Sequence, residues 1–329
     1  MTKVSEIEAR NPRQEAQSLL EPGWEARILE PSPPFDEDPQ WFADDPTEAG
    51  GSLVVTPIPG EGTTWGELAR RDERVRRFAD EHWLDGRRRL KALPPQFAIG
   101  RQALHQLAYF ALSPRRFAAN GKLALRYTAN GFGSPFFQGL AGGEQVRVEG
   151  LTLVRQTGNN ATGEPLSTVG AACRFVGVEY RETWYEFRDL LDPIDPATPL
   201  AIGPQAAATL AAWFGFGTHV LERLRRTGGA EEVSRVQLWP EHFDLAIEIG
   251  SAEQRASYGA SPGDESHAEP YLYVAAWGAI DRDDPYWNDQ NFNGASLPYI
   301  ALLEADDPYA TALAFLGEGH RKLIATVPK

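Results

Sequence analysis

The chain has very little cysteine. Cys173 is the only one among 329 residues, so no disulfide can form within the chain and a disulfide-stapled secreted scaffold is excluded. A reducing cytoplasmic compartment is the simplest expectation. Cys173 lies in the short apolar segment STVGAACRFVGV, whose helical pattern predicts a buried structural thiol rather than a nucleophile.

Long hydrophobic runs are also missing. The first residues, MTKVSEIEARNPRQ, lack the apolar stretch of a signal peptide. The most apolar segment, 206–221, is too short and too interrupted to cross a bilayer, so it predicts a buried core helix. We therefore expect no membrane partner.

Positive charge is scarce. The net charge is −14, and acidic residues dominate both in segment 1–50 and in the last third of the chain. An acidic surface repels phosphate backbones, so nucleic-acid binding is not expected. The arginines gather at 70–91, where they alternate with acids; this pattern is typical of a solvated helix face rather than a phosphate site.

The composition is that of a globular protein, with 42% hydrophobic and 24% charged residues. Hydrophobic periodicity predicts strands at 51–58, 122–128, 143–156, 234–250, 270–277 and 297–303. It predicts helices that begin near Thr64, Arg101, Ser167, Pro204 and Asp307, and Ser113-Pro114 should stop the second of them. Because strands and helices come in blocks, we expect an α+β fold: mainly antiparallel sheet with flanking helices and an extended N-terminal arm.

Segment 1–50 is acidic and rich in proline, which disfavours regular structure. It also carries Trp24, Phe35, Trp41 and Phe42, so we expect an extended arm whose aromatic side chains dock on the body. Residues 51–329 are expected to form a single large domain, and Gly228-Gly229 is the place where it would divide into two lobes.

Segment 235–277 holds the densest mixture of aromatic and ionisable residues. If 234–250 is one strand, His242 and Asp244 lie two residues apart and share a face. Such a pair can bind a metal or act as acid and base. The alternative is a hydrogen-bonded pair that fixes the end of a strand.

Two polar loops follow. Asp264, Glu265 and His267 lie in a loop after the Pro262-Gly263 turn, and their oxygen and imidazole groups suit a divalent metal; solvated charges are the alternative. No other cofactor is indicated. Segment 289–294 resembles half of a calcium loop, but Ile300 stands where the bidentate glutamate should be, so a turn held by asparagine side chains is favoured.

Residues 100–325 resemble a bacterial family of uncharacterised proteins that share a domain of unknown function. The resemblance rests on the KLALRYT strand, His242-Phe243-Asp244-Leu245-Ala246, Pro270-Tyr271-Leu272-Tyr273 and Leu297-Pro298-Tyr299. The family's His-Phe-x-x-Phe-Asp-Leu-Ala form is contracted here to His-Phe-Asp-Leu-Ala, which puts the register of His242 relative to Asp244 in question. The family implies no activity or cofactor.

Three functions fit the sequence. The first is a non-catalytic binder of a small molecule, with an aromatic-lined pocket made by Trp239, His242, Asp244, Tyr258, Tyr271, Tyr273 and Trp277. The second is a metal-dependent hydrolase-like enzyme whose ligands and base come from His242, Asp244, Asp264, Glu265 and His267. The third is a structural or protein-interaction module that uses the acidic surface and the N-terminal arm.

Overall fold

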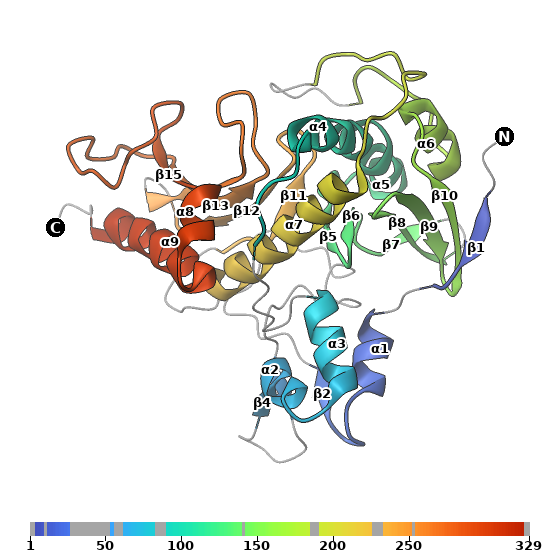
Figure 1. The fold of residues 1–329 in the computed structure, drawn as a ribbon, viewed down its shortest axis with the longest axis horizontal. Coiled ribbons are helices and arrows are strands. Elements are labelled where there is room, and N and C mark those ends of the chain that lie inside the picture. Colours follow the sequence, from blue (N-terminus) through green and yellow to red (C-terminus); the bar gives the residue numbers. More distant parts are fainter. Residues whose placement is uncertain are drawn as a thin grey trace.

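The chain forms the predicted α+β fold with mainly antiparallel sheet (Figure 1). The computed structural model describes residues 4–9, 12–26, 53–55, 62–82, 90–139, 142–184, 191–225, 233–251 and 254–325. Two large sheets lie on either side of a long central helix, and a small group of helices and short strands from the N-terminal part lies below them in the view of Figure 1.

The N-terminal sheet has the strand order β1-β10-β9-β8-β6-β5, and β7 also pairs with β8. All of its described pairings are antiparallel. Its strands are β1 (Ser5–Ile7), β5 (Arg126–Thr128), β6 (Gly131–Gly133), β7 (Phe137–Gly139), β8 (Gly142–Glu149), β9 (Thr152–Thr157) and β10 (Asn160–Pro165).

The C-terminal sheet is an antiparallel meander in which neighbouring strands follow each other in sequence. A pair of backbone hydrogen bonds between Leu125 and Leu238, 2.7 and 2.8 Å long, joins it to the N-terminal sheet. Its strands are β11 (Gln237–Trp239), β12 (Asp244–Ile249), β13 (Ala256–Ser261), β14 (Tyr271–Ala276) and β15 (Gly294–Pro298).

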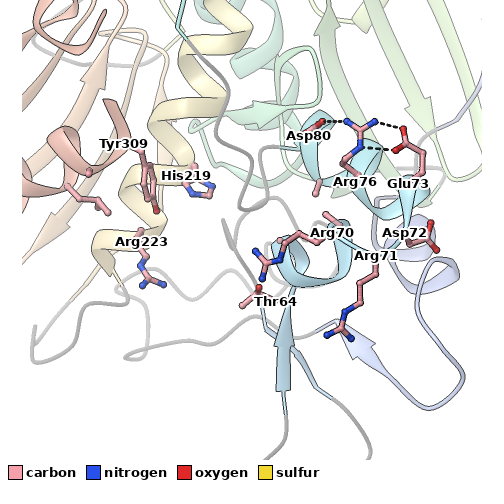
Figure 2. Close-up of a pocket in the computed structure, with 15 residues that line it drawn as sticks. Thr64, Arg70, Arg71, Asp72, Glu73, Arg76, Asp80, His219, Arg223 and Tyr309 are labelled. Carbon is pink, nitrogen blue, oxygen red and sulfur yellow. Dashed lines mark hydrogen bonds and ion pairs between the residues drawn. The ribbon is translucent and has the colours of Figure 1, made fainter. Parts of the chain in front are cut away.

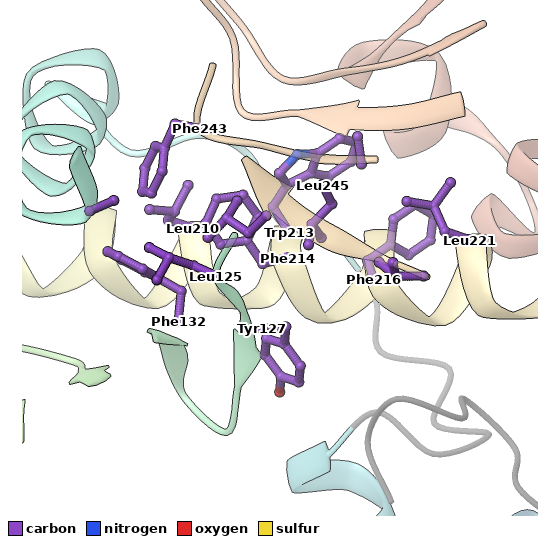
Figure 3. Packing of buried hydrophobic residues seen from close by; sticks show 14 of the residues in the cluster. Leu125, Tyr127, Phe132, Leu210, Trp213, Phe214, Phe216, Leu221, Phe243 and Leu245 are labelled. Carbon is purple, nitrogen blue, oxygen red and sulfur yellow. The ribbon is translucent and has the colours of Figure 1, made fainter. Parts of the chain in front are cut away.

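Helix α7 (Pro204–Arg225) runs between the two sheets and is buried along most of its length, as the apolar pattern of 206–221 predicts. Figure 3 shows its aromatic side chains among those of both sheets. Phe214 packs edge-on against Phe132 of β6 and against Phe243, with ring centroids 6.1 and 5.2 Å apart. Within the described residues, no helix is both long enough and apolar enough to cross a membrane.

The second predicted helix does not stop at Ser113-Pro114. Helix α4 (Phe97–Leu107) continues through a π-helical turn (Ala108–Leu112) into α5 (Ser113–Asn120). Proline lacks an N–H group, but in the first turn of a helix that group has no intrahelical acceptor. Pro114 stands in the first turn of α5, so the proline marks a new start instead of a stop.

The apolar segment 297–303 was predicted as a strand, and this is wrong for most of its length. Strand β15 ends at Pro298, and α8 (Tyr299–Glu304) follows at once. Tyr299 and Leu302, three residues apart, are buried. A short apolar run fits a strand or a buried helix equally well, so its periodicity could not decide between them.

Several local predictions are confirmed. Thr64 and Glu67 form the capping box of α2 (Trp65–Ala69). Helix α6 (Val169–Val176) begins after Thr168 and ends at Gly177, and α9 (Pro308–Ala325) begins where expected. Cys173 is buried, and burial raises the pKa of its thiol to about 11, as befits a structural cysteine.

The N-terminal part forms a second, separate hydrophobic cluster around Trp65, Val75 and Phe78, with Trp24 packed against it. Its elements are α1 (Pro12–Ser18), α2, α3 (Glu73–His82) and the short strands β2 (Glu25–Ala26), β3 (Leu53–Val55) and β4 (Gly62–Thr64). The described part of the predicted arm is thus partly helical, and β1 extends the N-terminal sheet. Phe35, Trp41, Phe42 and Gly228-Gly229 lie outside the described residues.

Replacing either of two helical glycines with alanine should change the stability of the protein in opposite directions. A Cβ atom at Gly217 of α7 would lie 2.7 Å from the Ala260 Cβ of β13, whereas at Gly317 of α9 its nearest neighbour is Arg321 Nη1 at 3.6 Å. We expect Gly217→Ala to lower the free energy of unfolding by about 1–3 kcal/mol through overpacking. Gly317→Ala should raise it by up to about 1 kcal/mol, since alanine favours the helix. Urea unfolding measures both, and equal changes would contradict the packing of α7 on the sheet.

Candidate functional site

Asp244 and Tyr273 meet across one strand of the C-terminal sheet. Asp244 begins β12, and Tyr273 lies on β14 directly opposite Gly259 of the intervening β13. Because Gly259 has no side chain, the Tyr273 ring lies over it, in the space that a Cβ atom would need. The Tyr273 hydroxyl donates a hydrogen bond to Oδ2 of Asp244. Glycine on the central strand is therefore what lets the two side chains reach each other.

Asp244 is a buried carboxyl group, only 6% exposed. Its second oxygen, Oδ1, has no hydrogen-bond partner among the described residues. Burial raises the pKa of Asp244, and the charge of Asp264 adds to the effect, while His242 and the Tyr273 hydroxyl act against it. Burial also raises the pKa of Tyr273, which keeps its phenol proton and can donate it.

A second carboxylate–phenol pair lies beside the first. The Tyr271 hydroxyl donates to Oδ2 of Asp264 over 2.6 Å, and the Tyr271 and Tyr273 rings lie 6.0 Å apart. Burial alone would raise the pKa of Asp264, but the hydrogen bonds from Tyr271 and from the backbone amides of His267 and Ser266 outweigh it and lower that pKa below its ordinary value. This site therefore pairs two carboxyl groups with opposite pKa shifts.

His267 links the two long loops of the sheet. Its Nε2 donates to Oδ2 of Asp289 over 2.9 Å, and its ring stacks on Tyr271 with centroids 4.2 Å apart. Asp289 is 3% exposed and also accepts a hydrogen bond from the Asn291 backbone. The loop 277–293 thus folds back from one end of β14 to meet the loop 262–270 at the other.

We call Asp244, Asp264, His267, Tyr271, Tyr273 and Asp289 the sheet-face cluster. Arg101 of α4 helps to hold its loop, because the guanidinium group lies against Gly263 and donates to the carbonyls of Pro262 and Ala268 over 3.4 and 3.3 Å. Gly263 has a φ of +99°, which glycine adopts without steric cost. Asn293 donates to the Ala276 and Gly278 carbonyls, so segment 289–294 is a turn held by asparagine.

His242 does not share a strand face with Asp244. The predicted strand 234–250 is two strands joined by a turn at 240–243, because Trp239 pairs directly with Asp244. His242 is exposed in that turn, and Phe243 adopts a left-handed φ of 56°. The strand-like alternation of side chains between two faces is broken here because the Phe243 ring packs into the core. There it stacks on His105, with ring centroids 5.0 Å apart.

The other predicted pocket residues are distributed around the sheet. Trp239 is the cross-strand neighbour of Asp244 and belongs with the cluster. Tyr258 lies on the opposite face, fully buried, with its hydroxyl 3.3 Å from Nδ1 of His320. Trp277 is 59% exposed beyond the end of β14, where Arg255 lies over its ring. Tyr258 and Trp277 are therefore not brought together with the rest.

The predicted metal ligands do not converge. Across the described part of the chain, no three side chains of His, Cys, Asp or Glu come close enough to hold a metal ion. Glu265 is exposed, as is His242. Nε2 of His267 is engaged by Asp289, and its Nδ1 lies 3.6 Å from Oδ1 of Asp264. The aspartates and the histidine form a hydrogen-bonded network instead.

Sequence reasoning missed a cleft between the N-terminal cluster and the main body (Figure 2). The cleft has a volume of about 1120 Å³, and α2 and α3 line one side while α7 and α9 line the other. Arg70, Arg223, His219 and Tyr309 contribute to its walls. The density of arginine at 70–91 was its only signal in the sequence, and nothing there indicated that α7 would lie opposite.

Comparison of the chain with protein-family models, with curated proteins and with solved structures found no match. The resemblance over residues 100–325 therefore stays a prediction.

Asp244→Asn keeps the side-chain shape and removes the charge. Because burial raises the folded-state pKa of Asp244, stability from this group is present at low pH and is lost as the pH rises above the ordinary value of 3.8 and through the folded pKa. We expect the variant to gain about 1–3 kcal/mol of unfolding free energy relative to wild type between pH 4.5 and pH 8. Urea unfolding across this range tests it.

The exposed Asp306→Asn substitution is the matched control. Both variants remove one carboxyl group, so the difference between them measures what is particular to the buried site. A stability difference for Asp244→Asn that does not change with pH would contradict the raised pKa of the buried carboxyl.

Proposed function

We propose that this protein binds a small molecule at the sheet-face cluster, and that the ligand presents a cationic or hydrogen-bond-donating group to Asp244. The observation that carries the proposal is the buried oxygen Oδ1 of Asp244, which accepts no hydrogen bond from the described residues. Leaving a buried acceptor unpaired costs about 1–3 kcal/mol. A donor supplied by a ligand would remove that cost.

Aromatic surfaces around Asp244 support the same proposal. Tyr271 and Tyr273 flank the carboxyl group, and Phe292 of the loop 277–293 packs edge-on against Tyr273 with centroids 6.1 Å apart. Small-molecule sites combine aromatic walls with a few placed polar groups, and aromatic rings also attract cations. Tyr273 and His267 are partly exposed, whereas Asp244 and Asp289 are buried, so the cluster leads from solvent to a buried acceptor.

The two alternatives have less support. A hydrolase-like metal centre needs three converging ligands, which the described residues do not provide. A protein-interaction module would present a contiguous apolar patch. The large exposed hydrophobic side chains of the described residues lie in separate segments of the chain: Val4, Ile99, Leu151, Trp277, Ile300 and Ile324.

The test is a thermal-shift screen with small cations such as agmatine, spermidine and choline, followed by calorimetry on any compound that binds. We expect a cation to bind the wild type and to lose at least tenfold in affinity in Asp244→Asn, since a buried charged hydrogen bond is worth about 1.5–3 kcal/mol. Affinity should rise with pH, because the cation binds the ionised carboxyl group.

Tyr273→Phe removes the donor to Oδ2 without removing the ring, so it should weaken binding as well. Asp306→Asn should bind like the wild type. A ligand that binds the wild type, Asp244→Asn and Asp306→Asn with equal affinity would contradict the placement of the site.

A further inference from the structure

The cleft between the N-terminal cluster and the body contains three arginines, Arg70, Arg71 and Arg223, that form no ion pair within the described part of the chain. Three acidic side chains are among the described residues that line the cleft, and all three are paired with other arginines: Asp72 with Arg74 over 2.7 Å, and both Glu73 and Asp80 with Arg76. The side chains of Arg70, Arg71 and Arg223 form no hydrogen bond or ion pair with another described residue.

Two of these arginines come from opposite walls. Arg70 ends α2, and Arg223 lies in the last turns of α7. In Figure 2 both guanidinium groups extend into the space between the two walls. Asp72 is the acid nearest to Arg70 in sequence, and it is paired with Arg74. The Glu67 carboxylate accepts hydrogen bonds from Thr63 and from the Thr64 backbone in the capping box. These hydrogen bonds lower the pKa of Glu67, and the charge of Arg70 contributes less to that lowering. Like charges that face each other across a cleft repel unless an anion lies between them.

We propose that this cleft binds a phosphorylated small molecule, whose phosphate oxygens are held between Arg70 and Arg223. Guanidinium groups suit this role because they stay charged and offer paired N–H donors that match phosphate oxygens. This site is separate from the sheet-face cluster, since it is built from α2, α3, α7 and α9 and shares no residue with that cluster.

The cleft has room for more than an inorganic anion. Its volume of about 1120 Å³ is slightly larger than that of most small-molecule sites, roughly 300–1,000 Å³. Besides the charged groups, its walls include Leu313 and the Tyr309 ring, which packs edge-on against His219 with centroids 4.6 Å apart. A ligand with an organic part beside its phosphates fits this lining better than phosphate alone.

The cleft also lies where the molecule has two separate hydrophobic clusters. Binding sites are frequent at such junctions, because a ligand can contact both parts at once. An anion held by Arg70 of one part and Arg223 of the other would tie the two clusters together.

Calorimetry with ATP, pyrophosphate and adenosine at low ionic strength tests the proposal. We expect ATP and pyrophosphate to bind the full-length wild type, adenosine to bind much more weakly, and affinity to fall as salt is added. The double variant Arg70→Ala/Arg223→Ala should lose at least tenfold in affinity. Arg70→Lys/Arg223→Lys should lose less, since the charge remains but the paired donors do not.

The matched control is Arg77→Ala/Arg321→Ala. Both of these arginines are exposed, on α3 and α9, and neither lines the cleft. The control should bind ATP within twofold of the wild type, and so should Asp244→Asn. Equal losses in the two double variants would overturn the proposal, because they would show a general effect of net charge. Failure of the wild type to bind either ATP or pyrophosphate would overturn it as well.

Discussion

The burial of α7 between two antiparallel sheets is the constraint on which the rest of the structure depends. A helix that is apolar around most of its circumference cannot lie at a surface, so it must be covered on several sides. Strands β5 and β6 cover one side, and β12 and β13 cover another. Gly217 lets β13 approach closely, and the Leu125–Leu238 bridge closes the sheets around the helix. The position of each sheet is thereby fixed relative to the other.

The same core determines where Asp244 lies. Phe243 contacts Phe214 of α7, Phe132 of β6 and His105 of α4. His105 Nε2 also donates to the Pro240 carbonyl over 2.8 Å, and burial lowers the pKa of His105 to about 4, so the ring stays neutral in that role. A left-handed residue other than glycine costs about 1–3 kcal/mol, and the burial of the Phe243 ring offsets that cost. The turn then delivers Asp244 to the first position of β12, under Tyr273.

Much of this arrangement follows from the sequence, and some does not. The capping box at Thr64, the limits of α6 and α7, and the antiparallel class all come from local signals that act over a few residues. The approximate place of the sheet-face cluster also follows from local sequence, because Asp264, Tyr271 and Tyr273 lie in one polar and aromatic segment. The turn at 240–243 could not be predicted. Polar and apolar side chains alternate through this segment as in a regular strand, and the strand is interrupted only because the Phe243 ring packs into the core. The partnership of His267 with Asp289, 22 residues away, depends equally on how a long loop folds back.

The charge near each proposed site differs from the net charge of the chain. A net charge of −14 describes the whole chain, but a ligand responds to the charges within about one Debye length, roughly 8–10 Å. At the sheet face, Asp244 and Asp289 are buried carboxyl groups, and the desolvation of a buried carboxylate is costly. At the cleft, arginines remain after the acids have been paired. The two proposed sites therefore suit ligands of opposite charge. A net negative charge of the whole chain does not prevent a small anion from binding at a cleft where α2 and α7 each contribute an arginine.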